Sequence, residues 1–247
     1  MTIKDIAKES GYAVGTVSRV LNNHPDVSEQ ARKRILAVVE KNGYIQNTNA
    51  KNLKQMVNRS ILVLVKGTRN ELFAALVEKL QGLLNNSPYT LLADYFDEDT
   101  DEVLRAITLC AEKKPQGILF LGGNADNFRQ SFGRIALPAV LVTSPAEGLE
   151  FPNLSSVTTD DFEASVQAVQ VLLDRGHRHI AIIGFDGLAL GEYLTPRLAT
   201  IGQSVERLAQ EATATLLDAI ETGAPARRVT VPFTVINGES VGDAPAV

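Results

Sequence analysis

The chain has 247 residues, 45% hydrophobic and 21% charged, which is an ordinary globular composition with enough apolar residues for a sizeable core. This composition excludes a disordered chain, a collagen and a coiled-coil rod. Apolar runs such as Ile61–Val65 are far shorter than the roughly 20 residues of a membrane helix, and the N-terminus carries no apolar secretion signal. The single cysteine, Cys110, excludes an internal disulfide, so we expect a cytoplasmic protein with no membrane partner.

Charge is divided unequally along the chain. Residues 1–59 contain ten Lys/Arg and five Asp/Glu, a net charge of +5. The remaining residues contain fourteen (24 − 10) Lys/Arg and 24 (29 − 5) Asp/Glu, a net charge of −10. A basic N-terminal part on an acidic body predicts that only the N-terminal part meets a polyanion.

Three short helices are predicted near the N-terminus. Thr2 and Asp5 have the spacing of a capping box, and Gly11 is placed to end the helix that they begin. A second helix is expected over Val14–Asn22, and a third is expected to follow the N-cap residue Ser28. Two short helices joined by a tight turn and braced by a third form the helix-turn-helix layout.

The residues of these helices resemble a known family. The segments TIKDIAKESG (2–11), TVSRVLN (16–22) and VSEQAR (27–32) resemble the headpiece of the LacI family of bacterial transcription regulators, and the match runs without a gap over about the first 55 residues. The resemblance implies a helix-turn-helix domain over residues 1–46. It also implies that the second helix is the recognition helix, which lies in the major groove of double-stranded DNA.

The resemblance names the candidate DNA-binding residues of this domain, most of which lie on the outer face of the recognition helix: Thr2, Val14, Gly15, Thr16, Ser18, Arg19 and Asn22. Val14 and Gly15 occupy the two positions that most often choose the operator sequence in the family. Hydroxyls and the Arg19 guanidinium can reach phosphate or guanine, whereas Val14 can offer apolar contact to a thymine methyl. Ala13 replaces the serine usual in the family, so this helix lacks the usual side-chain N-cap.

Residues 47–59 follow as a hinge or linker. The spacing of Ala50 and Leu53 resembles the hinge helix of the family, which folds on DNA and pairs with its twin in the minor groove. By this resemblance Asn47, Ala50 and Leu53 bind DNA, and Leu53 is the apolar wedge that opens a base step and kinks the duplex. The alternative is a plain linker with one leucine. Gln46 replaces the proline commonly found before the hinge.

The body, residues 60–247, alternates apolar strands with amphipathic helices. Strands are predicted over 61–65, 89–93, 117–121, 139–142 and 180–183, with intervening helices through Leu80, through Ile107 and over Val166–Leu173. Continuous apolar strands separated by helices predict a parallel sheet in an α/β fold. Cys110 is expected to be a small apolar residue on the core face of its helix.

By resemblance the body is similar to periplasmic sugar-binding proteins, with two Rossmann-like lobes and a ligand cleft between them. Residues 176–184 resemble the strand that opens the second lobe, and residues 185–187 resemble an aromatic-Asp motif at the end of its last strand. The segment 194–201, the helix that ends at Gly223 and the segment 231–235 resemble the part that returns to the first lobe.

The join between Gly184 and Phe185 departs from the family pattern. Elsewhere in the family these two motifs lie far apart, and here on the order of 80 residues are missing, or two or more βα units of roughly 30 residues each. A genuine internal deletion, an error of assembly or gene calling, and an omitted segment closed up in the numbering all explain the join. We therefore expect a second lobe that is largely missing, truncated near residues 160–190.

Other candidate sites are weak. The acidic run 97–102 lacks the sixth-position glycine and the distal glutamate of a calcium loop, so we expect acidic residues that open the next helix. His177 and His179 have no cysteine or acidic partner nearby, and Gly122-Gly123 lacks the remaining glycines of a nucleotide loop. No order of Ser, His, Asp or Cys suggests a catalytic triad. We predict that the protein is not an enzyme and that it binds no metal and no cofactor.

The predicted function is sequence-specific transcription regulation, as a repressor of carbohydrate-utilisation genes controlled by a small sugar-like effector. One recognition helix contacts too few bases to find its site in a genome, so we expect a homodimer on a near-palindromic operator. Thr143 and Asp186 align with effector-contacting positions of the cleft. A sugar-binding receptor without a transcriptional role and an effector-blind, truncated regulator are the alternatives.

Overall fold

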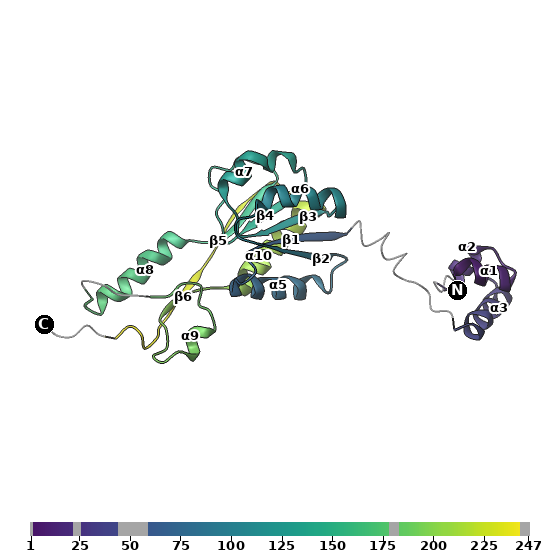
Figure 1. The fold of residues 1–247 in the computed structure, drawn as a ribbon, viewed down its shortest axis with the longest axis horizontal. Coiled ribbons are helices and arrows are strands. Elements are labelled where there is room, and N and C mark those ends of the chain that lie inside the picture. The colour runs from purple at the N-terminus through teal and green to yellow at the C-terminus, as the bar shows by residue number, and fades with distance from the viewer. Residues whose placement is uncertain (1, 22–25, 44–58, 178–182, 243–247) are drawn as a thin grey trace. The chain divides into compact units, whose positions relative to one another are not determined.

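Figure 1 shows a computed structural model of the chain. The structure describes residues 2–21, 26–43, 59–177 and 183–242. The residues divide into two compact units, Met1–Gln55 and Met56–Val247. The first unit is helical and the second is an α/β body. Among the described residues, no helix is long and apolar enough to cross a membrane.

The first unit is built from α1 (Ile3–Ser10), α2 (Val14–Leu21) and α3 (Glu29–Lys41). Apolar side chains at helical spacing turn inward from all three helices and form one small core: Ile6, Ala7, Val17, Val20 and Ile35. The three predicted helices are confirmed. The predicted end of the second helix, Asn22, lies outside the described residues.

Local side-chain chemistry sets the helix ends of this unit. Asp5 Oδ2 accepts hydrogen bonds from the Thr2 backbone N–H at 2.8 Å and from Thr2 Oγ1 at 2.9 Å, so the Asp5 arm of the predicted capping box is formed. Gly11 has a left-handed φ of 76° and donates its N–H to the carbonyl of Ala7, which ends α1. Ser28 Oγ accepts from the N–H of the first turn of α3, as predicted.

The second unit is built around a six-stranded sheet of order β2-β1-β3-β4-β5-β7, in which every neighbouring pair is parallel. Its strands are β1 (Ser60–Lys66), β2 (Thr90–Phe96), β3 (Gly117–Leu121), β4 (Ala139–Val142), β5 (Leu154–Thr159) and β7 (Arg228–Val231). The first four predicted strands are confirmed. The sequence reading missed β5 because serines and threonines interrupt its apolar pattern, although Ser155 and Ser156 are buried.

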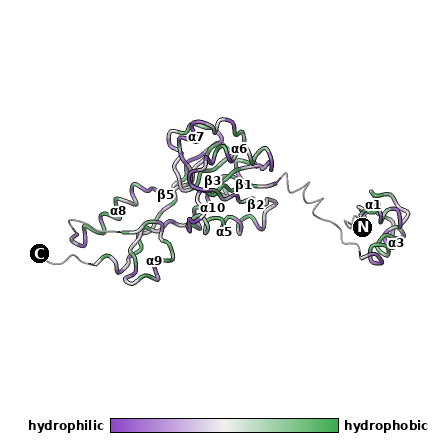
Figure 2. Tube along the Cα trace, in the orientation of Figure 1, coloured by the Kyte–Doolittle hydropathy of each residue, from purple (hydrophilic) through white to green (hydrophobic). Residues whose placement is uncertain are grey.

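Helices cover both faces of this sheet (Figure 1). Ile61, Val63 and Val65 of β1 point to the face covered by α5 (Glu71–Leu84) and α10 (Val205–Thr222). Leu62 and Leu64, the alternate residues of the same strand, point to the opposite face, which is covered by α6 (Glu102–Lys113), α7 (Ala125–Ser131) and the short helix η1 (Phe132–Arg134). Both faces of β1 are therefore buried, and hydrophobic and hydrophilic residues alternate along the covering helices (Figure 2).

A smaller substructure follows β5. It consists of α8 (Asp161–Asp174), α9 (Leu190–Tyr193) and the antiparallel pair of β6 (Thr200–Gln203) and β8 (Phe233–Ile236). Ala164 and Ala168 of α8 pack against Ile201 of β6, with Phe233 and Val235 of β8 beside them. These elements are what the chain retains of a second lobe, in accord with the predicted truncation.

One part of the predicted topology is corrected. The segments 194–201 and 231–235 were expected to return to the first lobe, but only α10 and β7 do so. Thr200 and Ile201 lie in β6, and the chain leaves the large sheet at Pro232, which separates β7 from β8. Because proline has no backbone N–H, it interrupts a strand ladder, and the chain changes sheets there. Most of the predicted strand 180–183 lies outside the described residues.

Candidate functional site

The outer face of α2 carries the residues predicted to read DNA. Val14 is 42% exposed, and Gly15 and Arg19 are also exposed. Thr16 and Ser18 are half-buried on the same helix, whose inner face contributes Val17 and Val20 to the core. The fold thus gathers a methyl-bearing side chain, two hydroxyls and a guanidinium on one short helix, the mixture that can contact base edges and phosphates.

Gly15 lies in the interior of α2, where glycine usually costs stability. A Cβ built at this position would have no atom within 4 Å. Packing within the headpiece therefore does not require the glycine. Its missing side chain leaves the outer face of α2 open to close approach by a binding partner.

Thr2, the other predicted DNA-binding residue, lies at the N-terminus of α1, where its hydroxyl donates to Asp5. The hydrogen bonds from the backbone and the side chain of Thr2 lower the pKa of the Asp5 carboxyl. The carboxylate therefore stays ionised at neutral pH. Its two bonds fix the position of Thr2 at the start of the headpiece.

A polar contact joins the ends of α1 and α3. Lys41 Nζ lies 2.9 Å from Glu9 Oε1, and Asn42 Nδ2 donates to Glu9 Oε2 at 3.1 Å. The hydrogen bond from Lys41 is the main cause that lowers the pKa of Glu9. This contact braces the helix packed beside the recognition helix. Sequence reading missed it because the two residues are 32 positions apart.

Four predicted DNA-binding residues cannot be placed. Asn22, Asn47, Ala50 and Leu53 lie outside the described residues. Their roles stay predictions that rest on the sequence.

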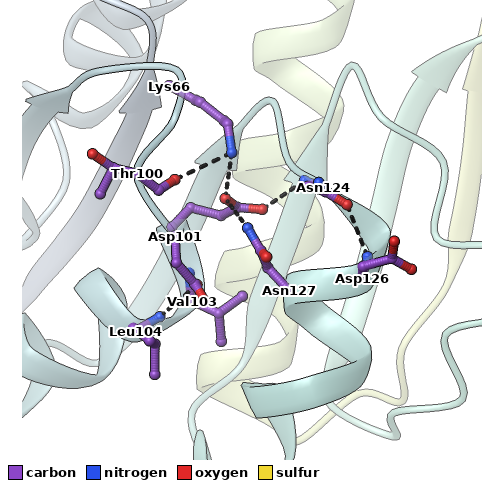
Figure 3. A network of polar contacts seen from close by, with 9 residues as sticks. Lys66, Thr100, Asp101, Val103, Leu104, Asn124, Asp126 and Asn127 are labelled. Carbon is purple, nitrogen blue, oxygen red and sulfur yellow. Dashed lines mark hydrogen bonds and ion pairs between the residues drawn. The ribbon is translucent and has the colours of Figure 1, made fainter.

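The body carries a buried polar network at the carboxyl edge of its large sheet (Figure 3). Lys66, the last residue of β1, places Nζ 2.6 Å from Glu102 Oε2 and 3.2 Å from the carbonyl of Thr100. Glu102 is fully buried at the start of α6 and also accepts from the Asn124 N–H at 2.5 Å and from Asn127 Nδ2 at 3.0 Å. The network ties β1, α6 and the loop before α7 together.

The acidic run before α6 opens the helix, as predicted. Asp101 is the N-cap residue and accepts hydrogen bonds from the backbone N–H groups of Val103 and Leu104, both at 2.9 Å. The sequence did not indicate that Glu102 is the buried partner of Lys66. Cys110 is half-buried against the core, as expected, and burial raises the pKa of its thiol to about 11.

The two predicted effector residues lie in different parts of the body. Thr143 directly follows β4 and has a positive φ of 68°, and its N–H donates to the carbonyl of Val157. Asp186 also has a positive φ, 76°, and lies beside the small substructure. Positive φ is uncommon for residues other than glycine and concentrates at functional positions. Among the described residues, no hydrogen bond joins Thr143 to Asp186.

A relay of hydrogen bonds holds Asp186. Thr159 Oγ1 donates to Gln203 Oε1 at 2.9 Å, and Gln203 Nε2 donates to Asp186 Oδ1 at 2.7 Å. Because Thr159 ends β5 and Gln203 ends β6, the relay spans the two points where the chain passes between the sheets. Burial, followed by the charges of Asp186 and Asp160, raises the pKa of Asp161 beside this relay. The sequence did not indicate Thr159 and Gln203, since neither residue belongs to a segment that resembles the family.

No group of three or more His, Cys, Asp or Glu residues that could hold a metal ion occurs in the part of the chain that the structure describes.

Two family models match the chain. Residues 2–47 match the bacterial regulatory proteins of the lacI family, and residues 157–241 match the periplasmic binding protein-like domain. The chain thus carries a headpiece of the lacI family and a segment of a periplasmic binding protein-like domain. The first match covers the three helices of the headpiece, and the second covers the small substructure together with α10 and β7.

Curated relatives include a protein named as a transcriptional regulator and one named as a catabolite control protein. The HTH-type transcriptional regulator MalR of Clostridium butyricum is 37% identical over 180 residues, which cover 71% of this chain and 53% of the relative. Catabolite control protein A of Priestia megaterium is 30% identical over 184 residues, covering 74% and 54% respectively. The chain spans about half the length of these relatives, and the internal deletion that the sequence predicts fits this length.

Solved structures share the fold. A lac repressor dimer bound to operator and the anti-inducer ONPF superposes with a TM-score of 0.79 at 14% identity, covering 98% of this chain and 99% of that chain. The transcriptional regulator CelR in complex with cellobiose superposes with a TM-score of 0.62 at 18% identity, covering 97% and 99%. At these identities the likeness establishes the fold alone.

Proposed function

We propose that the chain is a sequence-specific DNA-binding transcription repressor and not an enzyme. The observation that carries the proposal is the outer face of α2, where Val14, Gly15 and Arg19 are exposed on a helix held by the headpiece core. The net charge of +5 over residues 1–59 favours binding to a polyanion, and the −10 of the remainder disfavours it. Binding to genomic DNA places this activity in the cytoplasm.

In this proposal each residue of α2 has a separate task. Arg19 donates to a guanine edge or a phosphate, and Val14 contacts a thymine methyl. Thr16 and Ser18 contact the DNA backbone and set the register of the helix in the groove, and Asn22 extends this set beyond the described part of α2. Thr2 contacts the backbone from the start of α1.

The hinge is proposed to act in the minor groove. Asn47 and Ala50 contact DNA beside Leu53, whose side chain enters a base step and bends the duplex. Leu53→Ala should reduce the bend measured by a circular-permutation gel assay, because a methyl group cannot fill an opened step. Lys51→Ala, which removes a charge but no wedge, should leave the bend unchanged. An unchanged bend in Leu53→Ala would exclude the wedge.

A homodimer on a near-palindromic operator completes the proposal. One recognition helix contacts too few bases to select a site among roughly 10⁶ or more competing sites. A two-fold pair of helices doubles the number of bases that are contacted. By similarity to relatives named transcriptional regulator MalR and catabolite control protein A, the controlled genes serve carbohydrate utilisation. The effector is a sugar-like molecule, for which Thr143 and Asp186 are the proposed contacts. Similar regulators have been solved with sucrose, glucose and cellobiose.

An effector-blind regulator is the second candidate. It is favoured by the small size of the second substructure, whose described elements are α8, α9, β6 and β8. A buried sugar needs polar groups from two facing walls. A receptor without a transcriptional role would share the body fold but would have no use for the basic headpiece.

A fluorescence-anisotropy titration of the chain against operator-like and scrambled duplexes, repeated over a range of salt concentrations, tests the proposal. Log affinity should fall linearly with log salt, with a slope of roughly −0.9 for each neutralised phosphate, and the palindromic duplex should bind more tightly. Removal of residues 1–59 should abolish binding to every duplex. Retained affinity in the shortened chain would contradict the proposal.

A further inference from the structure

Helix α8 exposes a stripe of large apolar side chains. Its members are 39% to 80% exposed and follow the spacing 4-3-4 along one side of the helix: Phe162, Val166, Val169 and Leu173. We call these four residues the α8 stripe. The buried residues of the same helix, Ala164, Ala168 and Leu172, lie on another side. The 4-3-4 spacing is that of a coiled-coil seam, in which each such residue packs against a second helix.

The α8 stripe is a large exposed apolar patch for a single helix. Phe162 alone is 80% exposed, and the four side chains together expose on the order of several hundred Å² of apolar surface. The largest apolar patch on a soluble protein is of about this size, and such patches are often functional. The chain spans about half the length of its relatives, and within the described ranges no element covers the stripe.

The residues of the α8 stripe are arranged symmetrically along the helix. The stripe is symmetric about the point between Gln167 and Ala168. Phe162 and Leu173 lie equally far from this point on either side, and Val166 and Val169 do so as well. In an isologous two-fold contact, residue i meets residue j of the other subunit while j meets i. A helix with this symmetric spacing is therefore complementary to an antiparallel copy of itself.

We propose that α8 pairs antiparallel with α8 of a second copy of this chain. Phe162 then packs on Leu173 of the partner subunit, and Val166 packs on Val169 of the partner subunit. Each side chain of the stripe meets an apolar counterpart, with no charged residue between them.

The flanking residues are compatible with this register. Glu163 and Gln170 lie along the same edge of the α8 stripe, so in the antiparallel pair Glu163 faces the partner's Gln170, a pair without like charges. Charge therefore neither drives nor opposes the register.

The size of the contact limits its strength. A stable interface buries roughly 800 Å² on each partner, and the α8 stripe supplies about half of that area. We expect the α8 pair to be a weak contact alone, populated at high protein concentration or when another interface already brings two copies together.

Disulfide trapping tests the register in the full chain. Phe162→Cys chains mixed with Leu173→Cys chains should form a cross-linked dimer under mild oxidation. Either variant alone should not, because residue 162 and its counterpart in the partner lie about 16 Å apart along the helix axis. The native Cys110 supplies little background because burial raises its pKa to about 11, and the unsubstituted chain measures what remains.

Two controls separate the proposed contact from random collision. Phe162→Cys mixed with Gln167→Cys should not cross-link, because Gln167 lies on another side of α8. Adding Val169→Lys to the productive mixture should abolish cross-linking, whereas Gln167→Lys, the same charge on the same helix, should preserve it. All these positions are exposed, so the substitutions spare the core. Equal cross-linking in all mixtures, or none in the productive one, would overturn the proposal.

Discussion

Lys66 Nζ lies 2.6 Å from Glu102 Oε2, and the two side chains are only 17% and 1% exposed. Glu102 accepts two further hydrogen bonds, from the Asn124 N–H and from Asn127 Nδ2. Burial of a carboxylate this deep is tolerated only when its oxygens are fully partnered. The pair therefore joins β1, α6 and the loop after β3 at the sheet edge where α/β proteins place their ligands.

Glu102→Gln should destabilise the body by about 3–5 kcal/mol, because it leaves the Lys66 ammonium partly buried beside a neutral group. Urea unfolding followed by circular dichroism measures the loss. Asp126→Asn is the matched control, since it breaks an ion pair with Arg129 whose side chains are 71% and 53% exposed. This control should cost no more than about 1 kcal/mol. Equal losses in the two variants would contradict the role assigned to Glu102.

Arg19→Ala should weaken operator binding by about 1–3 kcal/mol and relax the preference at one base position, if the guanidinium reads a base edge. Arg34→Ala, which removes the same charge from the exposed side of α3, should change affinity less and leave the base preference intact. Anisotropy titrations against duplexes mutated one base pair at a time measure both effects. The same loss of affinity in both variants would show that Arg19 contributes only its positive charge and reads no base.

Gly15→Ala should stabilise the headpiece by about 0.5–1 kcal/mol, because alanine favours a helix interior and its Cβ meets no atom within 4 Å. Gly11→Ala is the opposite control. Its φ of 76° is unfavourable for a residue with a Cβ, and we expect a loss of about 1 kcal/mol. Amide hydrogen exchange of α1 and α2 in the full chain measures both changes. A destabilised Gly15→Ala would show a packing constraint that the fold does not indicate.

Stability of the headpiece should depend on pH through Glu9. Its pKa is lower in the folded state than the ordinary value of 4.5, chiefly because Lys41 donates to it. The contribution is therefore present above the unfolded pKa and is lost as the pH falls through the folded pKa. Hydrogen exchange of α3 in wild type and Glu9→Gln should differ at pH 6 and converge near pH 3. A difference that is independent of pH would assign the contact to packing.

If the chain is the effector-blind regulator, isothermal titration with a panel of mono- and disaccharides should give no saturable heat. A sugar that contacts a single wall exchanges its hydrogen bonds with water for protein hydrogen bonds of similar strength. The net gain in binding free energy is therefore small. Asp186→Asn should change nothing if the chain is effector-blind. Micromolar binding that Asp186→Asn abolishes would show instead that the shortened body retains a working pocket.

The local elements of this protein follow from short-range patterns in its sequence. Helix caps such as Ser28, the left-handed Gly11 and the alternation of Ile61–Val65 each act over a few residues, so spacing alone reveals them. The headpiece motif identifies the recognition face of α2 for the same reason, since Val14, Gly15 and Arg19 lie on one short helix.

Contacts between residues far apart in the sequence depend on the tertiary structure. Lys66 and Glu102 are 36 positions apart, and a capping pattern marks the acidic run without showing that one carboxylate turns inward. Gln203 holds Asp186 because β6 lies beside the end of β5, a relationship that no periodicity encodes. The exposure of Phe162 is decided in the same way. Apolar spacing predicts a buried face on a helix, but whether anything covers that face depends on the elements that the chain folds beside it.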